Sequence, residues 1–333
     1  MSSPVPFAEI WRGDFPESVH CGHAAVVDGT GAVRAAWGDP GTVILPRSSV
    51  KMIQALPLIE SGAAGAAGLT AEQLALACAS HQGAAIHVTR IMRWLDGLGL
   101  SEDALRCGPQ PSRDRELRFA MIRAGQPPGQ VHNNCSGKHT GFLTLARHIG
   151  GGPEYLDIDH PVQRAVRAAF EDMTGGPSPG WAIDGCSAPN FAAPLVAVAG
   201  AMARFATARP DAADGREAAA ARLVAAMMQH PDLVAGEGRA CTELMRAAPG
   251  RLAAKTGAEG VFVAILPEQG LGVAVKAADG ATRAAEAAIA ALLVRLGVLD
   301  PADPAVRRRI AAPIHNWRGV ETGFLRAAPG LLL

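Results

Sequence analysis

The spacing of hydrophobic positions changes twice along the chain, and the changes separate a strand-rich beginning, a helical middle and a strand-rich end. Residues 19–27 and 32–37 are short apolar runs that flank the turn sequence Asp-Gly-Thr-Gly, a pattern that predicts a β-hairpin. Residues 260–266 and 271–276 form a similar pair around Pro-Glu-Gln-Gly. Two such hairpins can join in one antiparallel sheet.

Between the hairpins, over residues 70–248, apolar residues recur mostly at helical spacing. Thr70 opens a capping box, Pro161 stands at the first position of another predicted helix, and a further helix is expected over 281–296. The chain is therefore expected to have an α+β fold, with an antiparallel sheet from the N- and C-terminal hairpins, flanking helices and a mostly helical middle region. No linker or repeat interrupts the pattern, so residues 1–333 are predicted to form a single domain.

Three shorter segments carry their own predictions. Residues 50–58 have the apolar spacing of a helix, which Pro57 should end or kink. Residues 61–68 are rich in glycine and alanine, which favours a flexible surface loop. Residues 192–208 are apolar but are broken by proline, glycine and arginine, which favours a buried helix over a membrane span.

Composition narrows the class of protein. Apolar residues make up 49% of the chain and charged residues 19%, which is typical of a folded globular protein. Basic and acidic residues balance at 31 each, so charge gives no reason to expect nucleic acid or an anionic membrane as a partner. The N-terminus has no signal-peptide pattern, so a cytoplasmic location is expected. In that reducing compartment the six cysteines would be thiols or metal ligands rather than disulfides.

The segment Leu-Pro-Arg-Ser-Ser-Val-Lys-Met over residues 45–52 places a serine three residues before a lysine. On a helix, Ser48 and Lys51 would share one face, and a neighbouring amine could take the serine proton and make the hydroxyl a nucleophile. The alternative is that these residues are only the polar beginning of a capped helix.

A later motif favours the catalytic interpretation. Lys255-Thr256-Gly257 precedes a predicted strand, and Ser-x-x-Lys followed by Lys-Thr-Gly is typical of penicillin-recognising serine enzymes. Ser80, in Cys-Ala-Ser-His-Gln-Gly, could supply a second hydroxyl that relays a proton between the substrate and Lys255. The alternative for Ser80 is an ordinary serine at the end of a helix.

Two polar loops carry cysteines. Cys135 lies in Asn-Asn-Cys-Ser-Gly-Lys-His, and Cys186 in Asp-Gly-Cys-Ser-Ala-Pro-Asn. Two thiolates and one nitrogen suit Zn²⁺, and His139 or Lys138 could supply the nitrogen. The alternative is a pair of reduced thiols in active-site loops. The remaining cysteines are predicted to be buried packing residues: Cys21, Cys78, Cys107 and Cys241.

Taken in order, these motifs resemble one known family. The segments PRSSVKMIQALPL, CASHQG, NNCSGKHTGF, DGCSAPNFA and KTGAEGVF are similar to those of the rhizobial-type L-asparaginases, which are distinct from the bacterial type I/II and plant-type enzymes. The resemblance covers nearly the whole chain. It implies a serine β-lactamase-like fold, a homodimer, and hydrolysis of L-asparagine to L-aspartate and ammonia.

The resemblance also assigns roles to individual residues. It implies two serine–lysine pairs, Ser48 with Lys51 and Ser80 with Lys255. The residues that match the family's zinc ligands are Cys135, Lys138 and Cys186. The residues expected to line the substrate pocket are Arg47, Asn134, His139 and Asp184. We expect Ser48 to be the nucleophile, and Ser80 is the alternative.

Two other classes of function stay open. A different acyl-serine hydrolase, such as a glutaminase, a β-lactamase or a peptidase-like enzyme, would keep Ser-x-x-Lys and Lys-Thr-Gly but would have no use for the Cys135 and Cys186 pair. A non-enzymatic zinc-binding protein would keep the cysteines but would be indifferent to the loss of Ser48 or Lys51.

Overall fold

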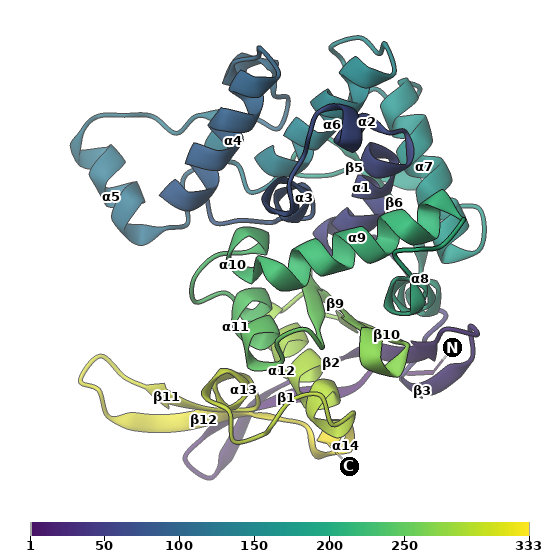
Figure 1. The fold of residues 1–333 in the computed structure, drawn as a ribbon. Coiled ribbons are helices and arrows are strands. Elements are labelled where there is room, and N and C mark those ends of the chain that lie inside the picture. The colour runs from purple at the N-terminus through teal and green to yellow at the C-terminus, as the bar shows by residue number, and fades with distance from the viewer. Residues whose placement is uncertain (1, 333) are drawn as a thin grey trace. The chain divides into compact units, whose positions relative to one another are not determined.

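The computed structural model describes residues 2–332, which group into two compact units (Figure 1). The sheet unit runs to Ser49 and includes Ala193–Thr207 and the chain from Glu243 onward. The helical unit comprises Val50–Ala192 and Ala208–Thr242. The single domain over 1–333 stays a prediction, because two compact units can belong to one domain.

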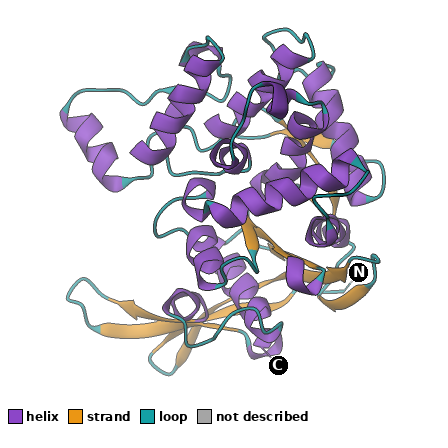
Figure 2. Ribbon diagram, in the orientation of Figure 1, coloured by secondary structure: helices purple, strands orange, loops and turns teal. Residues whose placement is uncertain are grey.

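The main element of the sheet unit is an eight-stranded antiparallel sheet, with its strands drawn in orange in Figure 2. Its order is β11-β12-β1-β2-β10-β9-β8, with β3 paired to β2. The strands are β1 (Val5–Arg12), β2 (Phe15–Asp28), β3 (Val33–Trp37), β8 (Ala253–Thr256), β9 (Val261–Leu266), β10 (Leu271–Ala277), β11 (Ala311–His315) and β12 (Glu321–Ala327).

The two hairpins predicted from the sequence are confirmed, and they do join in one sheet. Strand β2 pairs with β3 and also with β10, in a register that sets Leu271 opposite Asp28 and Ala277 opposite Gly22. Strands β1 and β8 and the hairpin β11–β12 were not predicted from the sequence. Strand β11 is an edge strand with a proline at Pro313, and edges are where a sheet tolerates proline, so its residues lack the usual strand pattern.

Helices α8 (Leu195–Thr207) and α12 (Thr282–Arg295) cover opposite faces of the sheet. Gly272 pairs with Val27, and a side chain there would lie 2.2 Å from the Ala199 carbonyl oxygen on α8. His20 is on the other face of β2, since side chains alternate along a strand. Its Nε2 accepts a hydrogen bond of 2.8 Å from Arg283 on α12.

Smaller elements complete the sheet unit. They are the paired strands β4 (Val43–Ile44) and β7 (Ala193–Pro194), the turn η4 (Pro267–Gln269), helices α13 (Pro304–Ile310) and α14 (Pro329–Leu332), and the turn η1 (Arg47–Val50), whose last residue belongs to the helical unit. The chain passes between the units in α11 (Ala240–Ala247).

The helical unit confirms the prediction of a mostly helical middle. Its helices are α1 (Lys51–Glu60), α2 (Ala63–Ala66), α3 (Ala71–Ala77), α4 (Ala85–Gly97), α5 (Arg115–Arg123), α6 (Ser136–His148), α7 (Pro161–Thr174), α9 (Gly215–Gln229) and α10 (Pro231–Val234). The turns η2 (Glu102–Ala104) and η3 (Gln130–His132) and the short hairpin of β5 (Trp181–Ile183) and β6 (Pro189–Phe191) connect them.

Helix α1 is the centre of this unit, and it rules out one of the two effects expected of Pro57, namely that the helix ends there. It packs against α3, α6, α7 and α9, and it is buried from Lys51 to Leu58. Pro57 does not end it, because this packing outweighs the one backbone hydrogen bond that proline removes, and the helix continues to Glu60. The loop expected over 61–68 is also wrong: it contains α2, whose first two alanines are buried.

Several local predictions are confirmed. Gln73 Oε1 accepts the Thr70 backbone N–H at 2.8 Å, as a capping box requires, and Pro161 is the first residue of α7. Helix α8 lies in the apolar segment predicted to be a buried helix, and most of its residues are buried. Within residues 2–332, no helix is both long and apolar enough to span a membrane.

Candidate active site

The turn that carries Ser48 gives its two serines different environments. Ser49 is fully buried, and its hydroxyl donates a hydrogen bond of 2.8 Å to the Pro46 carbonyl. Ser48 is partly exposed. Arg47, which precedes it, has a φ of 56°, in the left-handed region that non-glycine residues rarely occupy. The turn therefore leaves Ser48 accessible, whereas the hydroxyl of Ser49 is buried and is already used in a hydrogen bond.

Within the sheet unit, the Lys-Thr-Gly motif lies directly against this turn. A β-carbon on Gly257 would lie 2.7 Å from the Pro46 carbonyl oxygen and 3.3 Å from the β-carbon of Ser49. Only glycine allows so close an approach of the two backbones. Lys255 is fully buried, and its Nζ donates a hydrogen bond of 2.7 Å to the Thr256 carbonyl. The late motif and the serine turn are thus neighbours, although Lys255 follows Ser48 by 207 residues in the sequence.

Lys51 is the centre of a buried polar network in the helical unit. The side chain has no exposed surface. Its Nζ donates to the Ala79 carbonyl, lies 3.0 Å from Ser80 Oγ and 3.1 Å from Cys135 Sγ, and is 3.5 Å from the Asn134 carbonyl. The amine of the first motif therefore contacts the hydroxyl of the second and the sulfur of the third.

Glycines allow these segments to converge. Gly137 places the beginning of α6 against α3, where a β-carbon would lie 2.3 Å from the Leu76 carbonyl oxygen. Gly83 has a φ of +68°, and a β-carbon at this position would lie 2.6 Å from the His132 carbonyl oxygen. The His81 N–H then donates 3.2 Å to the Asn134 carbonyl. Each glycine lies within a motif, where a side chain would force the loops apart.

His81 and Ser136 support the same loops and were not assigned a role from the sequence. The Gly83 N–H donates to His81 Nδ1 at 3.0 Å, so the proton of a neutral ring is on Nε2, which lies 3.0 Å from Ser136 Oγ. Ser136 Oγ in turn donates to the Val131 carbonyl at 2.8 Å. Burial holds the pKa of His81 well below its ordinary value, so the ring is neutral and structural.

Cys135 and Cys186 come together with Lys138 on α6. Lys138 Nζ lies 3.2 Å from Cys186 Sγ, and all three side chains are buried. A hydrogen bond between the two cysteines lowers the pKa of Cys186 well below its ordinary value and, together with burial, raises that of Cys135 to about 12. The nearby Lys138 amine also lowers the pKa of Cys186.

This cluster fits the donor set expected for zinc. It brings two sulfurs and one nitrogen into contact, which is the soft-ligand chemistry that Zn²⁺ prefers. Within residues 2–332, no three histidine, cysteine, aspartate or glutamate side chains lie together in a group that could hold a metal ion. The set here has only two such side chains, and its third member is a lysine, which must lose its proton to bind a metal.

The other predicted pocket residues have mixed surroundings. Asn134 Oδ1 accepts from Cys135 Sγ at 2.8 Å, and Asp184 Oδ1 accepts the Gly185 N–H at 2.7 Å, so each supports a cysteine loop. His139 is fully buried, with Nδ1 2.9 Å from the hydroxyl of Tyr155. Burial lowers its pKa well below the ordinary value. Their contacts with substrate stay predictions, as does the pairing of Ser80 with Lys255.

Backbone strain is concentrated in the same motifs. Three non-glycine residues of the described chain have a positive φ: Arg47 at 56°, Ser187 at 68° and Glu259 at 56°. They lie beside Ser48, beside Cys186 and just after the Lys-Thr-Gly motif. Such conformations persist where the surrounding structure fixes them, and they are common at functional sites.

Two arginines near the Ser80 loop were missed because no motif contains them. The Arg113 backbone N–H donates 2.7 Å to the Gln82 carbonyl. Burial and the positive charge of Arg239 lower the pKa of Arg113. Arg239 Nη1 is buried and has no acceptor among residues 2–332. Two neighbouring cations with an unused donor are suited to bind an anion.

Comparison with known proteins supplies the family context. A protein-family model described as L-asparaginase II matches residues 8–327. No curated protein matches the chain significantly.

Three similar solved structures each have 14% sequence identity to the chain. A β-lactamase from Mycobacterium bovis has a TM-score of 0.47, over 89% of this chain and 97% of that one. A class C β-lactamase from Rhodobacter sphaeroides has a TM-score of 0.41, over 80% and 92%. Mglu in its native form has a TM-score of 0.44, over 85% of this chain and 65% of that one.

The close approach at Gly257 predicts a large effect from one methyl group. In Gly257→Ala, the new methyl would meet the Pro46 carbonyl and displace the turn that carries Ser48. We expect kcat/KM for the chain's substrate to fall by about 10- to 100-fold, because small displacements of reacting groups are costly.

Gly330→Ala is the matched control, since no atom lies within 4 Å of a β-carbon there. It should leave activity and melting temperature unchanged. Full activity in a folded Gly257→Ala variant would show that the turn does not depend on this contact.

Proposed function

The chain belongs to the L-asparaginase II family, and on that premise we propose that it hydrolyses L-asparagine to L-aspartate and ammonia through an ester with a serine. The family makes it a hydrolase of linear amides. The proposal about mechanism is carried by one observation, the buried contact between Lys51 Nζ and Ser80 Oγ at 3.0 Å. An amine in hydrogen-bond contact with a hydroxyl is the arrangement that serine–lysine chemistry requires.

In the proposed mechanism Ser48 Oγ attacks the side-chain amide carbon of asparagine, and Lys51 accepts the hydroxyl proton. The accessibility of Ser48 supports this assignment, since Ser49 is buried and hydrogen-bonded to Pro46. Only two residues separate Ser48 from Lys51 in the sequence. Backbone N–H groups of the turn would stabilise the developing oxyanion.

The second half of the reaction needs two further proton transfers. Ser80 and Lys255 would pass a proton to the departing ammonia, which leaves a β-aspartyl ester on the nucleophile. Water then attacks the ester carbonyl while a neutral amine of the network takes a proton from it, and the departing serine oxygen receives that proton. The contact of Lys51 with Ser80 supports a shared network, because one amine can then serve both hydroxyls.

Ser80 is the competing nucleophile, and a specific observation favours it. Among the described contacts of Lys51, the serine hydroxyl within hydrogen-bond distance is that of Ser80. Ser80 is buried, with 6% of its surface exposed. Ser48 is more accessible to a substrate, and for that reason we assign the attack to Ser48.

The α-carboxylate of asparagine needs a cation. Arg47, beside the proposed nucleophile, could bind it in a fork. Arg113 and Arg239 are a second possibility, supported by the buried, unused Nη1 of Arg239. Either choice would make the enzyme selective for a substrate with a free α-carboxylate.

We also propose that Cys135, Lys138 and Cys186 hold Zn²⁺. The ion would supply a positive charge that orients the substrate, since the nucleophile is already provided by serine. Cys135 is a member of the cysteine cluster, and its Sγ lies 3.1 Å from the catalytic amine of Lys51, so the cluster is in direct contact with that amine. That contact supports a role for the cluster in the reaction rather than in folding alone.

The assembly and location are proposals of the same kind. A homodimer follows from the family resemblance. A cytoplasmic location is supported by the six cysteines, all of which are free thiols in the structure.

Trapping the covalent intermediate tests the assignment of the nucleophile. Asparagine mixed with the enzyme and quenched in acid should leave a β-aspartyl ester, which peptide mass spectrometry would locate on the peptide that contains Ser48. An ester on Ser80 would reverse the roles of the two serines.

Metal analysis tests the zinc proposal. Protein purified without added metal should contain about one Zn²⁺ per chain, and Cys135→Ala or Cys186→Ala should reduce it below about a tenth of that. Cys241→Ala removes a buried thiol outside the cluster and should keep the metal. Chelation should raise KM more than it lowers kcat. Zinc content that is negligible, or equal in all three variants, would remove these residues as ligands.

A further inference from the structure

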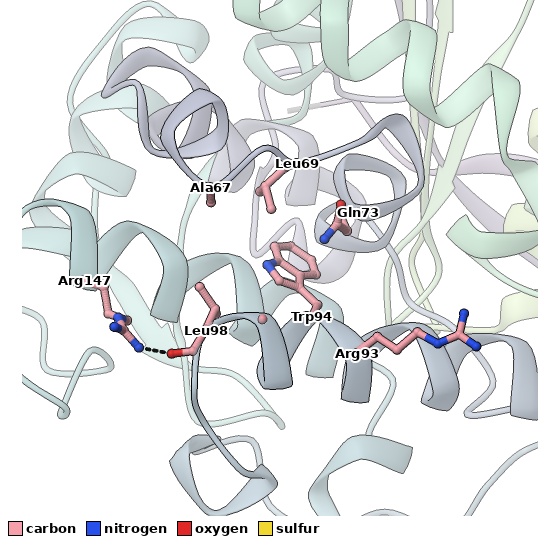
Figure 3. Close-up of a pocket in the computed structure, with 8 residues that line it drawn as sticks. Ala67, Leu69, Gln73, Arg93, Trp94, Leu98 and Arg147 are labelled. Atoms are coloured by element: carbon pink, nitrogen blue, oxygen red, sulfur yellow. Dashed lines mark hydrogen bonds between the residues drawn. The ribbon is translucent and has the colours of Figure 1, made fainter.

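The cavity of the helical unit offers little to a ligand. It has a volume of about 200 Å³ and lies among α3, α4, α6 and the segment between α2 and α3 (Figure 3). Its two arginines, Arg93 and Arg147, are exposed, and Arg147 donates to the Leu98 carbonyl. Trp94 is 3% exposed, and its Nε1 is fully buried. Among the described residues that line the cavity, none is a buried polar group that a ligand could reach, whereas several buried polar groups gather at the Cys135 loop of the same unit.

Two side-chain amides complete the hydrogen bonding of the Cys135 loop. The Cys135 N–H donates to Asn133 Oδ1 at 2.9 Å, and the Asn134 N–H donates to Gln110 Oε1 at 3.2 Å. Cys135 and Asn133 are buried, where an N–H without an acceptor would be unfavourable. The loop depends on these amides, because α6 begins only at Ser136 and helical hydrogen bonds do not serve the donors before it.

Asn133 is held at both ends of its amide. Nδ2 donates to the Cys107 carbonyl at 2.9 Å and to the Gly108 carbonyl at 3.0 Å. An amide group has two N–H donors, so one Nδ2 can serve both carbonyls. Rotating the amide by half a turn would set Oδ1 against these two oxygens and Nδ2 against the Cys135 N–H. The hydrogen bonds thus fix which end of the amide faces Cys135.

The peptide group that Asn133 holds also carries an acceptor for Lys51. In a planar trans peptide, the C=O of one residue and the N–H of the next point in opposite directions. With the Cys135 N–H on Asn133, the Asn134 carbonyl faces the other way. There it accepts the His81 N–H at 3.2 Å and lies 3.5 Å from Lys51 Nζ. A reversed peptide would lose both contacts and would turn its N–H toward the Lys51 amine.

We propose that Asn133 is a positioning residue for the reaction: by holding the Cys135 N–H, it keeps the Asn134 carbonyl and the Cys135 sulfur on the Lys51 amine. Both atoms belong to the residues that this peptide joins, and Cys135 Sγ lies 3.1 Å from Lys51 Nζ. The inference rests on the proposed function, in which Lys51 accepts the serine proton. Asn133 acts on the amine rather than on the substrate, so its loss lowers kcat and leaves KM nearly unchanged.

Two substitutions of Asn133 separate its hydrogen bond to Cys135 from its contacts with Cys107 and Gly108. A serine hydroxyl can accept an N–H two residues later in the chain, so Asn133→Ser should lower kcat for asparagine by only about threefold. Asn133→Ala removes this acceptor as well, and kcat should fall by about 30-fold with KM within about twofold of the wild type. Loss of the proposed zinc would raise KM instead, so the two effects are distinguishable.

Asn316→Ala is the matched control. Asn316 Oδ1 accepts the Arg318 and Val320 N–H groups in the hairpin β11–β12, so this substitution removes the same kind of turn contact in the sheet unit. It should leave kcat and KM unchanged. A fall in kcat equal to that of Asn133→Ala would show that the loss of any such turn is sufficient, and would overturn the proposal.

The exchange rate of the Cys135 N–H reports on the peptide without any substrate. Labelling with ¹⁵N-cysteine gives six backbone amide signals, one for each cysteine, and the signal lost in Cys135→Ser identifies the relevant one. Exchange should be about tenfold faster in Asn133→Ala than in the wild type or Asn133→Ser, because the N–H has lost its acceptor. Exchange in Asn133→Ala as slow as in the wild type would show that Asn133 does not hold this peptide, and would overturn the proposal.

Protection of the Cys135 N–H and kcat should fall together. A variant in which this N–H exchanges fast while kcat stays within about threefold of the wild type would overturn the proposal. Equal kcat values in Asn133→Ser and Asn133→Ala would do the same, because these variants differ in the acceptor for Cys135. Absence of ammonia release by the wild type would count against the proposed function, and the exchange rates would still decide whether Asn133 holds the peptide.

Discussion

The candidate site depends on one constraint, the hydrogen bonding of a fully buried lysine. A buried amine is very unfavourable unless acceptors surround it. Lys51, at the first turn of α1, obtains its acceptors from the Ser80 loop and the Cys135 loop, which are distant in sequence. Satisfying one side chain therefore fixes the three motifs of the helical unit relative to one another. The same contacts that make the burial tolerable place the amine beside a hydroxyl and a sulfur.

Close contacts between backbone segments also hold these motifs together. Gly137 lets α6 approach α3, and Gly257 lets the Lys-Thr-Gly strand approach the serine turn; in both places a β-carbon would collide with a carbonyl oxygen. Arg47 and Ser187, which adjoin Ser48 and Cys186 in the sequence, have left-handed conformations that only their surroundings can fix. The side chains that would carry the chemistry thus depend on close backbone contacts, whose loss would be costly.

The sequence predicted the parts of the fold whose signals are local. The hairpins, the capping box at Thr70 and the helical middle follow from periodicity and turn chemistry, and they are confirmed. Strand β11 has proline and exposed positions, so no local pattern marks it. Motif resemblance selected Lys51, Ser80 and Cys135, but their mutual contacts arise from tertiary packing of α1, α3 and α6. For that reason the sequence paired Lys51 with Ser48 and did not foresee its contact with Ser80.

The central claim is that this chain hydrolyses asparagine with Ser48 as the nucleophile. The most direct test is ammonia release from L-asparagine, with L-glutamine in parallel, by the wild type, Ser48→Ala and Ser49→Ala. We predict activity on asparagine that falls by about 10³-fold or more in Ser48→Ala and by less than about tenfold in Ser49→Ala, whose hydroxyl is committed to Pro46. Comparable ammonia release by the wild type and Ser48→Ala would contradict the account.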